Sequence, residues 1–440
     1  MNKLKTNCEY FARELAKIYD AVTAPLRSLD KRFKVVLAAI GVYNGANSLT
    51  LNYNQLYAVT LGANPVELGS LNSLGSVISS AVSVPAGWLI DKYGVKNLLV
   101  TGLALCGLVS ALYFCATSWL TLLPAVMLAQ LGFKLIMPLA DIVFVSTSRV
   151  ENRARLMGLS RTVWAIPSLF MPIVAAAIVS FYGGITVQGI RPLYFTQLLI
   201  IFAAAALIVF KLEELRVRSA FSETTGRVGE SAFLESLRDL FRGERGLRRW
   251  VVLMGLWRFE ISISMPFIML WMVYSKGADP YILGLVGTMG LVVSALLQIP
   301  IGIMADKMGR KKTFLITRPL TYLGTIILVV APNPQMLVLT GFLGALGLMG
   351  GFSDLSFIPF ITMFWEVVPM EKRGRWFGIT GVFDVLSVPA FLLGGFLWQE
   401  GLEELVLILP LLMEIFIIMP IILSVPETLH SNKAKNCEQN

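Results

Sequence analysis

Six ionisable side chains lie inside long apolar stretches of the sequence, where they could bind a solute or carry a proton. They are Lys134, Asp141, Arg258, Glu260, Asp354 and Asp384. A charge at the centre of a bilayer costs about 2.5–3.5 kcal/mol on insertion scales, so each of these residues needs a partner, water or a function. A carboxylate in a medium of low dielectric constant can keep its proton near neutral pH, which a proton carrier requires.

The sequence lacks the residues that several other kinds of chemistry require. The only histidine, His430, lies in the polar C-terminal tail, which argues against histidine-based triads and histidine-ligated metals in the apolar part. The four cysteines form no CxxC pair, and no phosphate-binding G-x-x-x-x-G-K-[ST] loop is present. We therefore predict no enzyme activity, no cofactor and no metal. The one enzyme alternative needs paired carboxylates, such as Asp141 with Glu260.

The elements that position these residues are predicted to be membrane-spanning helices. The chain has 440 residues, of which 56% are hydrophobic and 15% charged, and its mean hydropathy is +0.71. Such a supply of polar side chains does not cover a water-facing surface. Runs such as 99–119, 194–210 and 405–425 match the ~20 apolar residues that a spanning helix needs. We predict an all-α integral membrane protein with about twelve transmembrane helices.

The spans divide into two sets around a polar stretch. The predicted parts are a cytoplasmic N-terminal segment 1–34, a six-helix lobe 35–211, a cytoplasmic linker 212–248, a second six-helix lobe 249–424 and a cytoplasmic tail 425–440. Residues 230–241 of the linker have the spacing of a helix on the membrane surface, or equally of a solvated helix.

The basic residues predict the orientation. One set of connections is rich in lysine and arginine, for example Lys92 and Lys311, while the opposite set offers little beyond Arg191 and Lys276. An excess of lysine and arginine marks the cytoplasmic side. We expect both termini and the linker in the cytoplasm and the protein in the plasma membrane. The net charge of +9 then reflects topology, so no nucleic-acid partner is expected.

Two motifs occur twice. "VPAGWLIDKYGVKN" at 84–97 returns as "IPIGIMADKMGRKK" at 299–312, and "VENRARLMG" at 150–158 returns as "MEKRGRWFG" at 370–378. The shifts are 306 − 91 = 215 and 371 − 151 = 220 residues, which indicates duplication of a six-span unit. The shared positions that fit a gate are Gly87, Asp91, Gly94, Arg153, Gly302, Asp306, Gly309 and Arg373. Their glycines suit close helix approach and tight turns, and their aspartates suit a helix end.

These motifs resemble those of the major facilitator superfamily, whose loop between the second and third spans reads roughly G-x-L-x-D-R-x-G-R-[RK]. The first copy departs from that pattern at Lys92 and Val95, and the second at Met304 and Lys307. The resemblance covers nearly the whole chain. It implies two pseudo-symmetric six-helix lobes that rock about a central cavity, with Asp91 and Asp306 in the cytoplasmic closure or, as an alternative, only capping helices.

Three predictions about the intramembrane residues follow from helical spacing and from the repeat. Gln130, Lys134 and Asp141 share one stripe of the fourth span, which we expect to face the cavity. The repeat shift places Asp354 opposite Lys134, which suggests a pair between the lobes. Arg258 and Glu260 are two residues apart and point to different sides, so one is expected to face the cavity.

We expect Asp384 to accept Arg258, which leaves Glu260 as the acid of interest. Asn44 and Asn47 on the first span either line the cavity or join helices, and Trp257 either packs or offers its ring to an organic cation. Arg318 is expected to extend to the membrane surface. Glu414, deep in the last span, has no partner that the sequence identifies.

The leading functional prediction is a secondary transporter, expected to be monomeric, that moves a small organic solute by alternating access. Protons are the expected coupling ion, through Glu260, Asp354 or Asp141. The acids favour a cationic solute, whereas Lys134 and Arg258 favour an anion. A uniporter, a membrane receptor and a lipid-handling protein are the alternatives.

Overall fold

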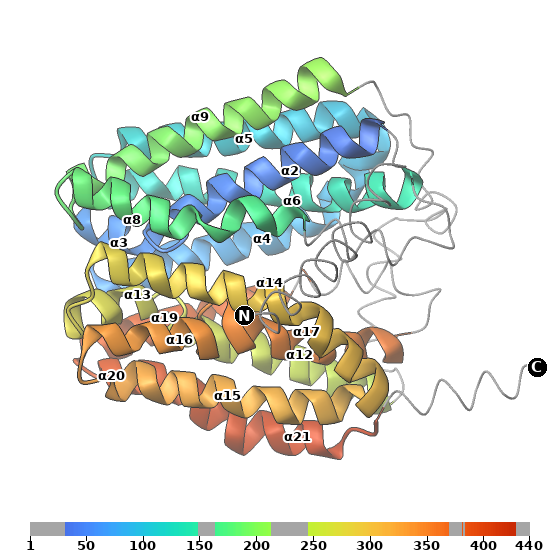
Figure 1. Cartoon of the computed structure of the whole chain (residues 1–440), viewed down its shortest axis with the longest axis vertical. Coiled ribbons are helices and arrows are strands. Elements are labelled where there is room, and N and C mark those ends of the chain that lie inside the picture. Colours follow the sequence, from blue (N-terminus) through green and yellow to red (C-terminus); the bar gives the residue numbers. More distant parts are fainter. Residues whose placement is uncertain (1–30, 148–162, 213–244, 369–380, 382, 428–440) are drawn as a thin grey trace, which may run out of the picture.

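The computed structural model describes residues 31–147, 163–212, 245–368, 381 and 383–427, and within these ranges the side-chain surroundings of 84–93, 138, 140–147 and 245–247 are left out. The described residues are almost entirely helical and contain no strand. Their elements form two layers, one above the other in Figure 1. The linker helix predicted at 230–241 lies outside the described residues.

The first layer, lobe 1, comes from the N-terminal half of the chain. Its helices are α2 (Lys31–Thr50), α3 (Asn54–Thr60), α4 (Pro65–Tyr93), α5 (Val95–Cys115), α6 (Leu122–Thr147), α8 (Met171–Phe181) and α9 (Val187–Lys211). The second layer, lobe 2, comes from the C-terminal half.

The α-helices of lobe 2 are α12 (Arg245–Ser264), α13 (Ile268–Leu270), α14 (Pro280–Met308), α15 (Arg310–Val330), α16 (Leu337–Leu343), α17 (Gly351–Val367), α19 (Ser387–Gln399), α20 (Glu403–Met413) and α21 (Met419–Ser424). Short 3-10 or π segments continue several of them, among them η6 (Phe383–Leu386) before α19 and η7 (Glu414–Ile418) between α20 and α21.

Grouped across their short internal breaks, the described elements give six spans in each lobe, which confirms the predicted count and fold class. Eight described segments are long and apolar enough to cross a membrane. The other four spans are the first, where α2 and α3 are separated by three residues, the 29-residue α4, the tenth, divided into α16 and α17, and the shorter eleventh. The protein is therefore a multi-pass membrane protein.

The tenth span contains a bend. The helix stops after α16 and restarts at α17, and Gly344, Gly347 and Gly350 between them have φ of 72°, 84° and 103°. Unwound backbone inside a membrane needs hydrogen-bond partners within the protein. Leu346 supplies an example, because its N–H donates to the Thr325 hydroxyl at 2.9 Å and its carbonyl accepts from Ser264 at 3.2 Å.

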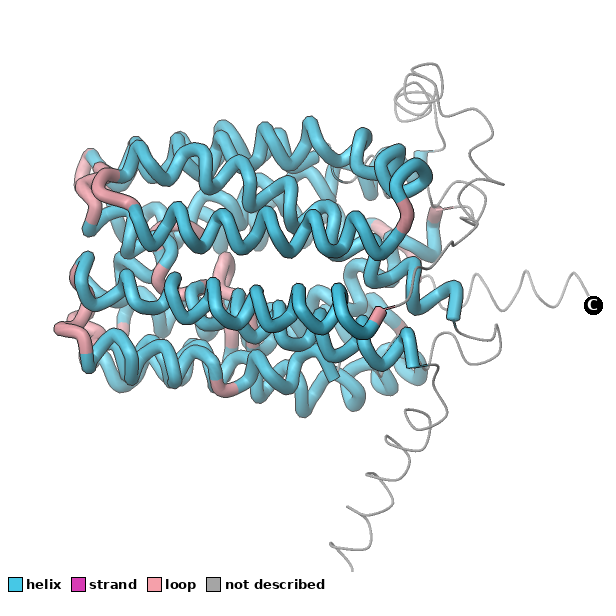
Figure 2. The backbone as a smooth tube through the Cα atoms, turned by 90° about the horizontal axis from the view of Figure 1, so that it is seen from above, coloured by secondary structure: helices cyan, strands magenta, loops and turns pink. Residues whose placement is uncertain are grey.

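Two ends of the bundle differ in the way the chain turns. At the short-loop end, on the left in Figures 1 and 2, the chain turns at Gly62, Gly183, Gly277 and Gly401. At the motif end, the repeated "DKxG" turns join α4 to α5 and α14 to α15 through Gly94 and Gly309. These two glycines have φ of 76° and 106°, a region that side chains with a Cβ rarely adopt, so the predicted tight turns are present.

The lobes are in contact along α4 with α19 and along α8 with α14. Small residues bring the backbones together, since a Cβ on Gly395 would lie 2.6 Å from the Pro65 carbonyl oxygen and one on Gly284 only 2.7 Å from Ala176. At the short-loop end one buried apolar cluster includes residues of both lobes, such as Tyr53 and Trp398.

Toward the motif end the buried clusters belong to one lobe each. One of them lies in lobe 1, from Phe33 to Leu212, and another lies in lobe 2, from Trp250 to Val425. The lobes therefore share a core at the short-loop end and keep separate cores at the motif end.

Candidate functional site

The lobes meet at mid-depth on a group of four polar residues, here named the Asp384 cluster: Ser79, Lys134, Arg258 and Asp384. Ser79 of α4 donates a hydrogen bond to the Asp384 carboxylate at 2.7 Å, and Lys134 of α6 lies 3.4 Å from the same oxygen. Arg258 of α12 reaches the other oxygen with Nε at 2.9 Å and with a second guanidinium nitrogen. Asp384, in η6 of lobe 2, thus holds two donors of lobe 1.

The charges of the Asp384 cluster do not cancel. It contains one carboxylate and two cations, so its formal charge is +1. The Asp384 side chain is only 9% exposed, whereas Arg258 is 56% and Lys134 21% exposed. The acid is enclosed by its donors, and the free surface of the cluster is cationic.

A second group, the Arg318 cluster, is enclosed within lobe 2: Trp257, Glu260, Arg318, Ser356 and Glu414. Arg318 of α15 forms a bidentate ion pair with Glu414 of η7, with nitrogen to oxygen distances of 2.5 and 2.7 Å. A third nitrogen donates to Ser356 at 3.0 Å, and the guanidinium lies 4.3 Å from the centre of the Trp257 ring. Arg318 therefore has a partner on each side, as a fully buried cation requires.

Glu260 is the exception in the Arg318 cluster. Its side chain is fully buried, it lies 4.0 Å from Arg318, and among the described residues neither of its oxygens accepts a hydrogen bond. The cluster has one cation and two acids, and Glu414 already takes the cation. An ionised Glu260 would leave an uncompensated charge in a dry interior, so the charge balance favours a proton on this group.

Helix α12 connects the two clusters. It carries Arg258 on the side that faces lobe 1 and Glu260, two residues later, on the side that faces the interior of lobe 2. Two residues turn an α-helix by about 200°, which places the two side chains on opposite faces. A change at one cluster that moves α12 therefore also displaces a side chain of the other cluster.

Comparison with known proteins gives the family. A family model of the Major Facilitator Superfamily matches residues 35–259 and, a second time, residues 250–439. The chain belongs to the major facilitator superfamily. The two matches correspond to the duplicated unit that the repeated motifs predict.

Solved structures of the superfamily share the fold. A D-xylose-proton symporter aligns over 90% of this chain and 98% of its own with a TM-score of 0.62 and 13% identity. A nucleoside transporter, NupG, aligns over 89% and 99% with a TM-score of 0.64 and 11% identity. At such identities the likeness concerns the fold alone.

A sequence relative is the organic cation/carnitine transporter 7 of Arabidopsis thaliana, which is 32% identical over 83 residues. The match covers 19% of this chain and 15% of that protein, so the chain spans only a small part of this relative's length.

Within this superfamily fold, two predicted pairings have clear outcomes. The predicted pair of Arg258 and Asp384 is confirmed. Lys134 faces the other lobe, as predicted for its stripe, but its partner is Asp384 and not Asp354. Asp354 instead lies 3.5 Å from the Ser294 hydroxyl. Repeat symmetry relates spans, but the side chain of Lys134 is long enough to reach the neighbouring eleventh span.

One expectation about lobe 2 is wrong, and the structure decides between the alternatives for two other residues. Of Arg258 and Glu260, it is Arg258 that faces the contact between the lobes, while Glu260 is fully buried within lobe 2. The packing alternative holds for Trp257, because Arg318 lies 4.3 Å and Phe360 4.1 Å from the centre of its ring. The expectation that Arg318 extends to the surface is wrong, because it is fully buried and pairs with Glu414 of the last span.

The amides of lobe 1 act mainly between helices of that lobe. Asn47 accepts from Gln197 of α9 at 3.3 Å, which favours the interhelical alternative for this residue. Asn44 is half-buried in α2. Gln130, one turn before Lys134, is also half-buried, and its amide nitrogen lies close to Gly75 of α4. Asp141 belongs to α6, but its side chain is among those left out.

The gate motif is described in part. Asp306 pairs with Arg310 of the next helix at 2.9 Å and is 71% exposed, in agreement with an acid at a helix end. The close packing expected at Gly302 is absent among the described residues, where a Cβ would meet nothing within 4 Å. Gly87 and Asp91 lie in α4, with their surroundings left out, while Arg153 and Arg373 fall outside the described residues.

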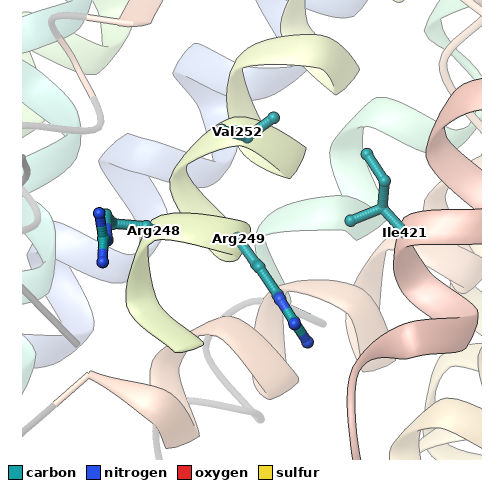
Figure 3. A pocket seen from close by; sticks show the side chains of 4 residues that line it. All are labelled: Arg248, Arg249, Val252 and Ile421. Atoms are coloured by element: carbon teal, nitrogen blue, oxygen red, sulfur yellow. The ribbon is translucent and has the colours of Figure 1, made fainter. Parts of the chain in front are cut away.

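A surface hollow of about 380 Å³ lies away from both clusters, at the start of α12. It is lined by Arg248, Arg249, Val252 and Ile421, and Figure 3 shows the two arginines pointing apart. It belongs to lobe 2 alone and takes no part in the contact between the lobes.

Ser79, Arg318, Ser356 and Glu414 are the residues of the two clusters that sequence reasoning did not include among the candidates. A serine in a helix carries no distinctive signal. Arg318 and Glu414 lie 96 residues apart, and only the packing of α15 against the last span brings them together.

Proposed function

We propose that this protein is a secondary active transporter that moves a small organic solute by alternating access, coupled to protons. The Asp384 cluster is the observation that carries the proposal. It is a partly accessible group of charged side chains at mid-depth between two lobes whose other described polar contacts are hydrogen bonds to backbone carbonyls, such as Asn52 to Leu283 at 3.2 Å and Ser73 to Val388 at 3.1 Å. We further propose that the protein acts as a monomer in the plasma membrane, with the motif end and both termini in the cytoplasm.

The distribution of the core supports alternating access. The shared apolar cluster closes the short-loop end, whereas the separate cores leave the lobes independent at the motif end. Exchange of the open side requires the contacts of α4 with α19 and of α8 with α14 to loosen at the short-loop end. The Asp384 cluster would lie at the pivot of that rocking motion. Its charged side chains would pair either with a solute or with one another.

Glu260 is the proposed proton carrier. Its charge balance favours the protonated form, and loss of the proton would make it compete with Glu414 for Arg318. That competition shifts groups packed against α12, which also carries Arg258. Protonation at Glu260 is thereby linked to the contact between Arg258 and Asp384. In the alternative, a uniporter, the Arg318 cluster is only structural and proton gradients have no effect.

The intramembrane-enzyme alternative is weaker. Asp141 lies on α6 of lobe 1, whereas Glu260 is fully buried inside lobe 2, so the two carboxylates do not suit a shared reaction site. The names of similar proteins agree with transport. The D-xylose-proton symporter is named for a small solute and a proton, the nucleoside transporter for a small solute and the plant relative for an organic cation and carnitine.

Flux measurements in liposomes test the proposal. Purified protein is reconstituted with a pH-sensitive dye inside, and sugars, nucleosides, amino acids, organic cations and organic anions are added in turn. At least one solute is expected to cause a proton flux that stops in Glu260→Gln, while exchange of labelled solute continues. Glu404→Gln, an exposed acid at the short-loop end, is the matched control. Solute flux that ignores the pH gradient would refute proton coupling, and no flux of any solute would refute transport.

A further inference from the structure

Two places of opposite charge lie at the contact between the lobes. The first is the cationic surface of the Asp384 cluster, where the exposed guanidinium of Arg258 from lobe 2 and the partly exposed Lys134 from lobe 1 share one enclosed carboxylate. The second is Asp354 of α17. Its side chain is exposed, it accepts hydrogen bonds from the Gly350 backbone and, at a long 3.5 Å, from Ser294, and no described cation lies within ion-pair distance.

The packing of α17 shows which way Asp354 faces. The exposed residues of α17 are Asp354 and Phe357, one turn apart on the same face of the helix. Phe357 lies against Trp257 of α12, at 5.8 Å between ring centres, and Asp354 lies against Ser294 of α14. The exposed face of α17 therefore lies between α12 and α14.

Both flanking helices make contact with lobe 1. α12 does so through Arg258 and the Asp384 cluster. On α14, Ser294 lies two turns from Gly287, where a Cβ would come within 2.9 Å of Pro172 in lobe 1. A face enclosed between these two helices is directed at lobe 1 and not at lipid.

The two places lie about one turn apart in depth. Trp257 directly precedes Arg258 in α12 and packs against Phe357 of α17 at 5.8 Å between ring centres, and Phe357 is one turn from Asp354. A cationic and an anionic place thus stand close together in depth, on neighbouring helices of lobe 2.

We propose that the solute is a zwitterion, with an anionic group that binds at Arg258 and Lys134 and a cationic group that binds at Asp354. This inference rests on the proposed function and names its substrate class. Ligand sites with few polar groups use them to fix orientation, and a charge left without a partner in a low-dielectric site is costly. A solute with a single charge leaves one of the two places uncompensated, whereas an amino acid or betaine satisfies both.

Equilibrium binding to the purified full-length protein tests the proposal. The probes are ω-amino acids of increasing length, from glycine to ε-aminocaproate, together with glycine betaine. Each amino acid is compared with the carboxylic acid and the amine of the same chain length, for example hexanoate and hexylamine. D-xylose and uridine serve as uncharged probes. Binding is followed by the shift in unfolding temperature and by calorimetry.

We expect at least one zwitterion to bind about tenfold or more tightly than both of its singly charged analogues, equivalent to about 1.4 kcal/mol. Asp354→Asn should remove the preference over the carboxylic acid, and Lys134→Met should weaken the preference over the amine. Asp354→Glu keeps the charge and should keep the preference, which guards against a general folding defect. Glu404→Gln should behave as the unaltered protein does.

Three results would overturn the inference: no binding of any zwitterion, tighter binding of a singly charged or uncharged probe, or an unchanged preference in a folded Asp354→Asn variant. Binding needs neither a membrane nor a gradient, so these results are separate from those of the flux experiment. Proton-coupled flux of an uncharged solute would reject the zwitterion and keep the transporter. Zwitterion binding without flux of any solute would reject the transporter and keep the zwitterion as the ligand.

Discussion

Glutamines at the two acids of the Arg318 cluster should destabilise the protein far more together than the sum of their separate effects. Arg318 now pairs with Glu414 through two short hydrogen bonds, and Glu260 stands 4.0 Å from the same guanidinium without a hydrogen bond among the described residues. Glu260 is therefore a reserve partner. The perturbation consists of Glu260→Gln, Glu414→Gln and the double variant.

The expected magnitudes follow from the geometry. Glu260→Gln replaces a group that holds no hydrogen bond, so its cost should stay near or below about 1 kcal/mol. In Glu414→Gln, an ionised Glu260 can neutralise Arg318, since opposite unit charges 4 Å apart attract by about 4 kcal/mol at an effective dielectric constant of 20. Much of the loss is then recovered, and a net cost of about 1–2 kcal/mol remains.

The double variant has no reserve partner. Arg318 keeps Ser356 and the ring of Trp257, both neutral, and stays fully buried. Removal of the charge partners from a buried ion typically costs about 3–5 kcal/mol. The coupling energy between the two substitutions should therefore be about 1–3 kcal/mol, destabilising, within the range seen for residues in one network.

The assay is a double-mutant cycle on unfolding free energy, measured for protein in mixed micelles by titration with a denaturing detergent. Helical circular dichroism follows unfolding, and Glu404→Gln is the control. Additivity within about 0.5 kcal/mol would show that Glu260 does not substitute for Glu414. A cost of Glu260→Gln equal to that of Glu414→Gln would refute the assignment of Glu414 as the principal partner.

Three further predictions concern the lobes and their orientation. Gly284→Val should disturb the close contact of α14 with α8, open the short-loop end and slow transport, whereas Gly302→Val should have little effect. The opening is measured by the accessibility of cysteines introduced near the contact. Asp384→Asn should leave Lys134 and Arg258 without their acid and lower transport at least about tenfold, and it would contradict the assignment if flux stayed normal. Cysteines placed at Lys96 should react only from the cytoplasmic side, and labelling from outside would reverse the proposed topology.

The fold was predictable because it depends on patterns that can be recognised in the sequence alone. Apolar runs of spanning length and two repeated turns, at Gly94 and Gly309, are enough to indicate twelve spans in two related halves. These features are local or periodic, so neither requires knowledge of which side chains meet across the bundle.

The candidate site was predictable only where spacing on a single helix decides. The opposite directions of Arg258 and Glu260 follow from a separation of two residues, and the structure has them so. The pairing of Lys134 with Asp384, and of Arg318 with Glu414, depends on how neighbouring spans pack. Arg318 was expected at the surface because its position along the sequence does not reveal that Glu414 of the last span lies beside it.

Under the proposed function, the same pairing lets one helix join proton binding to solute binding. An isolated buried ion pair of Arg318 with Glu414 would be balanced, and a proton gradient would not act on it. The additional acid at Glu260 would make the charge balance depend on one proton, and α12 carries that acid two residues from Arg258. Because Arg258 pairs with Asp384, and Asp384 holds two donors of lobe 1, such a change of charge inside lobe 2 would act on the only ionic contact between the lobes among the described residues.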